Sequence, residues 1–370
     1  MMGSDRYVRR QDQLIQLLKE RQTKCLLVTH TPNITYLTGF TGDSSFLLVH
    51  TDHRPILISD QRFTVQIAEE CPDLEAKIRG PQRNTYQETA DLLKLLQIQN
   101  LGVESSITFA SCELLKSLVP ALQLHLCSGA IEQLRAIKDS AEIELIQTAI
   151  QIAEAGFQAY RPMIQNRDTE KDLVNLLEML MKRVGADGPA FPIIVGIGER
   201  SALPHCPPSS KVASSSGFLL TDWGAKYHGY HSDITRVFRR TGGEISPTDL
   251  ARIEQIYNVV HEAQQRAINK LYPGTHVREV DQAARGWITE QGFGEQFNHG
   301  LGHGIGLEIH EAPSIRYNSE DILQAGMVVT IEPGIYLEGF GGVRIEDDVL
   351  ITEDGPQVLT KLTKSWSDLW

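Results

Sequence analysis

The sequence predicts two domains, a small α/β domain over residues 1–130 and a larger α+β domain over residues 131–370. Three observations predict this fold class. The 370 residues exceed the usual size of a single domain. Short apolar runs alternate with helix-like stretches in the first part of the chain, as is typical of α/β domains. In the second part the order helix, helix, strands occurs twice, which predicts a duplicated α+β unit.

The first domain begins with an amphipathic helix over residues 7–21. Short apolar runs predict strands at residues 25–28, 45–50, 55–59 and 100–104. Polar helix-like stretches follow at residues 64–70 and 87–97. The stretch 38–45 contains glycines but lacks the lysine and the helix-opening GxGxxG of a phosphate loop, so we predict a tight turn there.

The second domain opens with a long amphipathic helix, because apolar residues recur at three- and four-residue intervals over residues 143–157. A second helix is expected at about 169–184 and ends at Gly185. The remaining elements are strand-like runs at 190–198 and 217–240, helices at 247–271 and 276–291, and a strand-rich block at 326–360.

Composition excludes several classes of protein. A net charge of −12 argues against a nucleic-acid binder. The five cysteines are scattered and form no CxxC pair, which argues against a disulfide framework or a zinc ribbon and favours a reducing compartment. The N-terminus lacks the apolar region of a secretory signal, and the longest apolar run, 191–198, is too short to cross a bilayer. We therefore expect a cytoplasmic protein that binds no membrane.

Residues 298–311, NHGLGHGIGLEIHE, combine three histidines with four glycines. His299 and His303 stand four apart, which on a helix would place them on one face, as in zinc proteases. Each glycine costs a helix about 1 kcal/mol relative to alanine, so we predict an extended chain instead. Residues an even number apart share a face there, so both histidines still point the same way. The glycines would let the backbone approach a bound group.

Two aspartates stand on the arms of a predicted hairpin, residues 219–236. Asp222 and Asp233 are eleven positions apart, and an antiparallel register would set them side by side. Aspartate is a poor strand former, and two facing carboxylates without a partner would raise one pKa strongly. The alternative is a pair of solvent-facing aspartates, with Asp233 bound to Arg236.

Two glutamates lie in apolar strand-like runs. Glu332 follows the run 327–331, and Glu346 lies inside the alternating run 343–351. Burying either side chain without a partner would be expensive. A surface position explains Glu338 and Asp348 well but explains Glu332 poorly.

Together with His303, these carboxylates form a set of mostly hard oxygen ligands. Such a set suits two divalent ions better than a structural zinc site. We expect Mn²⁺ first, with Co²⁺, Fe²⁺ or Zn²⁺ as alternatives. Two ions about 3.5–4 Å apart activate water for hydrolysis.

Four ordered motifs, TDWGAKYHGYHSDITR, NHGLGHGIGLEIHE, TIEPGIY and GVRIEDD, resemble those of the pita-bread metallopeptidases of family M24. The resemblance is to the Xaa-Pro peptidase branch, which contains aminopeptidase P and prolidase. ITYLTGFTG and ISDQRFT are similar to the N-terminal domain of this branch, and LRAIKDSAEIELI to its interdomain helix. The resemblance implies a creatinase-like N-terminal domain before a pita-bread catalytic domain.

The resemblance implies that five residues hold the two ions. These are Asp222, Asp233, His303, Glu332 and Glu346. Asp233 and Glu346 would bridge both ions, and His303 would be the sole nitrogen ligand.

The resemblance also implies roles for residues beside the ions. His299 and His310 match histidines that contact the substrate and stabilise its oxyanion. His205 matches a third active-site histidine, on the loop before the metal hairpin. Arg344 and Tyr336 match residues that hold a ligating carboxylate in place.

Simpler interpretations stand beside these roles. On its own, His205 would be an exposed residue of a proline-rich turn, and Tyr336 a core aromatic. His228 and His231 match no family position and are interpreted as surface or wall residues. Cys206 either makes the site sensitive to oxidation or is an inert neighbour.

The implied reaction is metal-assisted hydrolysis of the bond before a proline at position two, with Glu332 carrying a proton to the leaving nitrogen. The first hypothesis is an Xaa-Pro aminopeptidase acting on short peptides as a homodimer, and the alternative is an Xaa-Pro dipeptidase (prolidase). A non-catalytic binding module of this fold and a creatinase-like amidinohydrolase are weaker hypotheses, because all five ligands are present. Methionine aminopeptidase shares the metal site and suggests a side activity.

Overall fold

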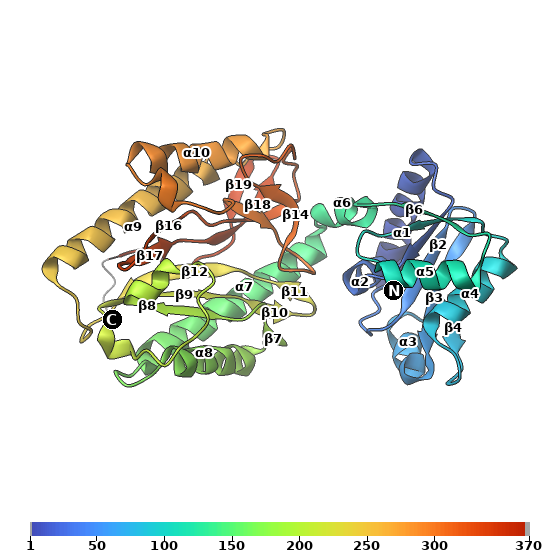
Figure 1. Ribbon diagram of the computed structural model, residues 1–370, viewed down its shortest axis with the longest axis horizontal. Helices are drawn as coiled ribbons and strands as arrows, with labels where there is room; N and C mark the ends of the chain where they lie inside the picture. The colour runs from blue at the N-terminus through green and yellow to red at the C-terminus, as the bar shows by residue number, and fades with distance from the viewer. Residues whose placement is uncertain (1, 367–370) are drawn as a thin grey trace. The chain divides into compact units, whose positions relative to one another are not determined.

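The computed structural model describes residues 2–366 of a chain that divides into two units, Met1–Arg135 and Ala136–Trp370 (Figure 1). The first unit is built on a six-stranded mixed sheet of order β4-β3-β2-β1-β5-β6. Its strands are β1 (Cys25–Val28), β2 (Phe46–His50), β3 (His53–Asp60), β4 (Glu75–Arg79), β5 (Asn100–Val103) and β6 (Gln123–Leu126). Its helices are α1 (Met2–Glu20), α2 (Thr31–Thr38), α3 (Thr64–Glu70), α4 (Thr85–Leu95), α5 (Phe109–Leu118) and α6 (Ala130–Ala136).

The central strand of this sheet shows why the apolar runs became strands. Every residue of β1 is buried, as expected of a strand covered on both faces. It pairs antiparallel with β2 and parallel with β5. The tight turn expected at residues 38–45 follows α2, which ends at Gly39 with φ of 79°, a left-handed conformation that glycine adopts without strain.

The second unit contains the order helix, helix, strands twice, as the sequence predicted. The first half consists of α7 (Ser140–Tyr160), α8 (Glu170–Val184), β7 (Gly188–Pro189), β8 (Ile194–Ile197), β9 (Phe218–Trp223), β10 (Ala225–Tyr227), β11 (Tyr230–His231) and β12 (Ile234–Arg239). The second half consists of α9 (Pro247–Ile268), α10 (Val277–Glu290), β13 (Gly302–Gly304), β14 (Glu311–Ile315), β15 (Val328–Ile331), β16 (Gly334–Leu337), β17 (Gly341–Arg344), β18 (Asp347–Thr352) and β19 (Gly355–Val358). Figure 1 shows strands of this unit between the helix pairs α7–α8 and α9–α10.

Helix ends follow local signals in the sequence. The side chains and backbones of Asp139 and Glu142 form a capping box at the start of α7. Thr169 and Asp172 do the same at the start of α8, which ends at Gly185 as predicted. These caps satisfy backbone groups that would otherwise lack partners.

Each helix pair covers its own apolar core. One cluster packs α7 and α8 against strands of both halves, and a second packs α9 and α10 against strands from both halves. In the first cluster the rings of Trp223 and Phe157 stack with centroids 4.0 Å apart, and Trp223 Nε1 donates to Ala153 O. The side chain next to Asp222 is therefore held by packing and by a hydrogen bond. None of the helices described between residues 2 and 366 is both long and apolar enough to cross a membrane.

The predicted hairpin exists, but its register differs from the expected one. β9 and β12 pair antiparallel, with Asp222 opposite Thr235 and Trp223 opposite Ile234. The residues between them leave this sheet and form β10 and β11, of which β10 also pairs with β7. The chain leaves the sheet at Gly224. Only glycine fits at this position, because a Cβ there would lie 1.8 Å from Ser232 O. Asp222 and Asp233 are therefore not opposite each other: the partner of Asp222 is Thr235, two positions after Asp233.

Candidate metal centre

A cavity of about 850 Å³ lies in the second unit. Nine of the ten residues predicted for the site line it: His205, Asp222, Asp233, His299, His303, His310, Glu332, Arg344 and Glu346. The tenth, Tyr336, lies behind this lining, where its hydroxyl contacts Arg344 Nη1 at 2.7 Å. Strand ends from both halves therefore bring together side chains that are up to 141 positions apart.

Three of these residues are arranged as a metal-binding group. Ligand atoms of Asp233, His303 and Glu346 all lie within 4.8 Å of one another. His303 Nε2 is 3.7 Å from Asp233 Oδ2 and 3.4 Å from Glu332 Oε1. His303 Nδ1 lies 3.1 Å from Gly304 O, and since a carbonyl only accepts, Nδ1 carries the proton. The Nε2 lone pair consequently faces the carboxylates, as a metal ligand requires.

Three carboxylate oxygens at the cavity are buried and have no hydrogen-bond partner among the described residues. They are Asp222 Oδ1, Asp233 Oδ1 and Glu346 Oε1. Burying such atoms without a partner is costly. Because the partner oxygens of Asp222 and Glu346 are held by Arg344 and Thr235, the orphaned oxygens are fixed toward one region. This donor set fits divalent cations, which prefer carboxylate oxygen.

The pKa values indicate the same excess of negative charge. Burial, followed by the charges of the neighbouring carboxylates, raises the pKa of Asp233 and of Glu346 well above the ordinary range. Burial also raises the pKa of Glu332 to about 8, although Arg344 opposes the shift. Burial, and then His310, lowers the pKa of His303 to about 4. The histidine is thus neutral at pH 7, and the carboxyls need a cation to ionise.

The stretch 298–311 is extended and irregular rather than helical, as predicted, with β13 at its centre. Gly300 and Gly302 line the cavity, and two of the glycines also lie against neighbouring backbone. A Cβ on Gly302 would lie 2.0 Å from Thr330 O, and one on Gly304 would lie 2.1 Å from Ala312 O. The glycines allow neighbouring backbone segments to approach, which holds His303 between β14 and β15.

A chain of hydrogen bonds joins Asp222 to His299. Arg344 Nη2 donates to Asp222 Oδ2 at 2.5 Å, and Arg344 Nη1 donates to the Tyr336 hydroxyl. His299 Nδ1 lies 2.7 Å from Gly300 O and must donate to it, so His299 Nε2 accepts from Tyr336 Oη at 3.0 Å. Burial lowers the pKa of His299 to about 4 and raises that of Tyr336 to about 12, so both are neutral at pH 7. Both ring nitrogens of His299 are therefore engaged by the protein.

His205 and His310 present their rings to the cavity from two loops. The His310 ring packs edge-on against His303, with centroids 4.4 Å apart, and burial lowers its pKa. The loop that carries His205 is anchored by Glu170, which is fully buried and accepts from Ile197 N and Ser209 N.

Cys206 follows His205 and is buried, with Arg200 Nη2 3.2 Å from its sulfur. Burial, and then the charge of Glu170, raises the pKa of the Cys206 thiol. A raised pKa keeps the sulfur as the unreactive thiol at neutral pH, which favours the inert neighbour over the oxidation-sensitive residue.

Several expectations for neighbouring residues need revision. Asp348 was expected at the surface, but it is fully buried and its Oδ2 accepts from Asp233 N at 3.0 Å. The sequence signal was present, because Asp348 stands two positions after Glu346 in the same apolar run, and residues two apart in an extended chain share a face. The alternative pairing of Asp233 with Arg236 is also wrong, since Arg236 binds Asp347 instead.

The two unassigned histidines and Glu338 lie where the sequence placed them. His228 is exposed, whereas His231 is buried and its Nδ1 contacts Gly306 O. Glu338 is exposed, in agreement with its surface interpretation. His231 therefore supports the loop that follows β13, the strand of His303.

Two family models match the chain over its two units. Metallopeptidase family M24 matches residues 144–353, and the Creatinase/Prolidase N-terminal domain matches residues 10–137. An Xaa-Pro dipeptidase of Pyrococcus horikoshii is 35% identical, over 94% of this chain and 95% of its own length.

Solved structures share the fold over almost the whole chain. An Xaa-Pro dipeptidase from Bacillus anthracis aligns with a TM-score of 0.90 at 39% identity, covering 97% of this chain and 99% of that one. An X-Pro aminopeptidase from Thermotoga maritima aligns with a TM-score of 0.83 at 36% identity, covering 92% of this chain and 96% of that one.

Proposed function

Because this chain belongs to metallopeptidase family M24, we propose that it is a metal-dependent peptidase whose first substrate is an Xaa-Pro dipeptide. Its fold is that of the family, a creatinase-type N-terminal domain followed by a pita-bread catalytic domain. The observation that carries the proposal is the set of orphaned carboxylate oxygens around Asp233, Glu346 and His303. A binding module or an amidinohydrolase would have no use for this set.

Membership of the family implies divalent metal ions. We infer two ions, Mn²⁺ first, held by Asp222, Asp233, His303, Glu332 and Glu346. Bound ions of this kind polarise the scissile carbonyl and lower the pKa of water.

The protein side chains supply the remaining chemistry. Glu332 lies at the edge of the centre and is proposed to pass a proton to the leaving nitrogen. His310 and His205 face the cavity and are proposed to donate hydrogen bonds to the developing oxyanion. His299, whose nitrogens are both engaged, is proposed to orient Tyr336 and Arg344 rather than to bind substrate.

The cavity supports a short substrate that ends in a carboxylate. Apolar side chains, including Phe191 and Ile309, offer a surface for a proline ring. Arg316 also lines the cavity and is exposed, and its side chain has no hydrogen-bond or ion-pair partner among the described residues. A guanidinium in this position would pair with the free carboxylate of a dipeptide, a group that a longer peptide carries elsewhere. This feature favours the dipeptidase over the aminopeptidase, and the name of the P. horikoshii relative agrees.

The test is hydrolysis of three substrates by Mn²⁺-reconstituted protein: an Xaa-Pro dipeptide, an Xaa-Pro-Yaa tripeptide and a Met-Ala-Yaa tripeptide. Chelated protein is the blank. We expect metal-dependent cleavage, fastest for the dipeptide. Faster cleavage of the Xaa-Pro tripeptide would support the aminopeptidase, a candidate favoured by the T. maritima relative. No cleavage of any substrate by metal-loaded protein would refute the proposal.

A substitution of Arg316 tests whether this residue binds the carboxylate of the dipeptide. Arg316→Met should lower kcat/KM for the dipeptide by roughly 10- to 100-fold, the loss expected for one charge-assisted contact. The tripeptide should be affected much less. Arg278→Met is the matched control, because Arg278 forms an exposed pair with Glu320 outside this cavity. Equal losses for both substrates would contradict the assignment.

Two further proposals concern the protein's surroundings. The five cysteines are free, which supports the cytoplasm as the location. A homodimer is proposed from family resemblance, and light scattering coupled to size-exclusion chromatography tests it. A mass near the monomer's 41.3 kDa would contradict the dimer.

A further inference from the structure

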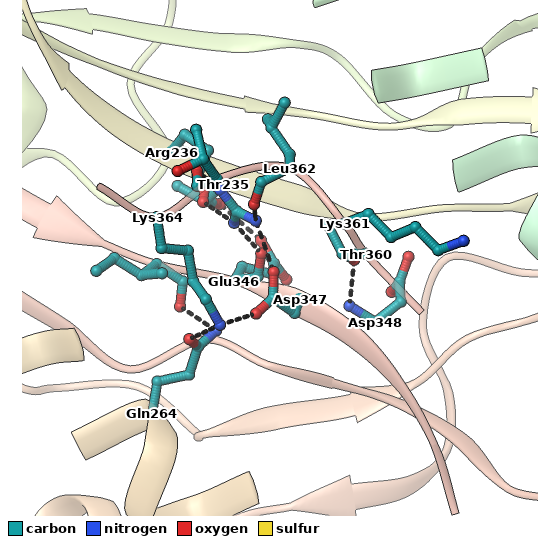
Figure 2. A network of polar contacts seen from close by, with 12 residues as sticks. Thr235, Arg236, Gln264, Glu346, Asp347, Asp348, Thr360, Lys361, Leu362 and Lys364 are labelled. Atoms are coloured by element: carbon teal, nitrogen blue, oxygen red, sulfur yellow. Dashed lines mark hydrogen bonds and ion pairs between the residues drawn. The ribbon is translucent and has the colours of Figure 1, made fainter. Parts of the chain in front are cut away.

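Four polar residues form a network beside the cavity, which none of them lines (Figure 2). We call Arg236, Gln264, Asp347 and Lys364 the Asp347 network. Asp347 is fully buried and lies between two cations, with Oδ1 2.7 Å from Arg236 Nη2 and Oδ2 2.6 Å from Lys364 Nζ. A buried carboxylate paired on both oxygens has little freedom to move.

Arg236 connects this carboxylate to the main chain of the metal centre. A guanidinium has five N–H groups, and all five donate hydrogen bonds here. The acceptors are Asp347 Oδ1 and the carbonyl oxygens of Thr235, Glu346, Leu362 and Thr363. Thr235 in turn donates its hydroxyl to Glu346 Oε2 at 2.6 Å. Both the backbone and the side chain of Glu346 are therefore fixed from this side.

Gln264 of α9 binds the backbone just before two of the proposed metal ligands. It is fully buried, and its Nε2 donates to Ile331 O at 3.0 Å and to Ile345 O at 3.2 Å. These residues directly precede Glu332 and Glu346. Gln264 Oε1 accepts from Lys364 Nζ at 3.0 Å, and this contact keeps the amide NH₂ directed at the two carbonyls.

We propose that Lys364 and Gln264 are positioning residues that set the spacing between Glu332 and Glu346. The proposal rests on the metal centre assigned above. Ligand atoms must be held within about 0.5 Å of productive geometry, and neighbouring hydrogen bonds supply that restraint. Lys364 directs the amide of Gln264 and pairs with Asp347, so one cation supports both restraints. Neither residue lines the cavity.

The experiment measures metal binding directly. Metal-free protein is titrated with MnCl₂ by isothermal calorimetry, which gives Kd and stoichiometry without any substrate. Lys364→Met, which keeps the length of the side chain but removes the charge, should weaken Mn²⁺ binding at least tenfold. Lys364→Arg should recover most of the affinity, because it restores a cation and donors.

Two controls separate positioning from general damage. Lys182→Met removes an exposed cation paired with Glu178 on α8 and should leave Kd unchanged. Ile288→Val removes one methylene from the fully buried side of α10 and should lower the melting temperature without changing Kd.

Three results would overturn the proposal. These are a folded Lys364→Met protein with a Kd within twofold of wild type, equal weakening by Ile288→Val, and no recovery by Lys364→Arg. If Lys364→Met does not fold, Gln264→Met decides in the same titration, by the same tenfold and twofold limits. A wild-type protein that binds no Mn²⁺ would instead refute the metal centre itself.

Discussion

The excess of carboxylates at the centre predicts how the stability of the metal-free protein depends on pH. The folded-state pKa of Glu332 is about 8, against an ordinary value of 4.5. The folded protein therefore holds a proton that the unfolded chain releases, and stability falls as pH rises from about 4.5 to 8. Asp233 and Glu346 shift in the same direction and add to the fall.

Histidines act in the opposite direction to these carboxyls. The pKa values of His299 and His303 are lowered to about 4 from 6.5. Folding thus favours their neutral forms, as it does for His231, His261 and His310, whose pKa values are also lowered, so this contribution rises with pH until about one unit above 6.5. Between pH 6.5 and 8 histidines of the unfolded chain still lose protons, so only the difference between wild type and Glu332→Gln isolates the carboxyl. At about 1.4 kcal/mol per pH unit, Glu332 by itself should cost about 2 kcal/mol over this interval.

The assay is urea unfolding in chelator at several pH values from 6.5 to 8. Tryptophan fluorescence reports on the second unit alone, because all four tryptophans follow residue 135. From pH 6.5 to 8 the stability of wild type should fall by about 2 kcal/mol relative to that of Glu332→Gln, in which the histidine contribution is the same. Mn²⁺-loaded wild type should show no such fall, because the cations keep the carboxylates ionised. An equal fall in wild type and Glu332→Gln would refute the reasoning.

Three further outcomes follow from the same geometry. Arg344→Met removes the buried cation beside Asp222 and should cost about 3–5 kcal/mol in urea unfolding, so a loss below about 1 kcal/mol would contradict the pairing. Asp233→Asn should abolish binding of at least one Mn²⁺ in a calorimetric titration, and wild-type stoichiometry would argue against Asp233 as a ligand. Trp223→Phe should cost about 2–4 kcal/mol through lost stacking on Phe157 and a lost hydrogen bond, with Mn²⁺ affinity within twofold of wild type.

The sequence predicts the helices and strands that are buried, because burial requires a recognisable pattern of apolar residues. β1 is buried on both faces and reads as the uninterrupted run CLLV, and α8 ends at Gly185 because a left-handed residue closes it. β4 and β6 were not predicted, because both are edge strands whose side chains are largely exposed or half-buried. Strands that need few apolar residues leave a weak signal.

In the candidate site, too, some residues could be predicted from the sequence and others could not. Carboxylates in apolar runs mark Glu332 and Glu346 because burial of an unpaired charge needs a reason. The residues behind them could not be predicted, since Asp347 and Lys364 look like ordinary surface charges in the sequence. Only the fold shows that Arg236 and Leu362, 126 positions apart, meet there.

That separation has a consequence for biosynthesis. The hairpin that carries Asp222 is synthesised 142 positions before Lys364, a delay of roughly 7–30 s at about 5–20 residues per second. Until Lys364 leaves the ribosome, the nascent chain displays its acidic hairpin without the cation that completes the support behind it. If Lys364 positions the ligands as proposed, a nascent chain that has not yet exposed Lys364 should bind metal more weakly than the finished chain. A premature stop or a ribosome stall before residue 364 would yield a chain that keeps Asp222, Asp233 and Glu346 but lacks the support that holds Glu346 in place.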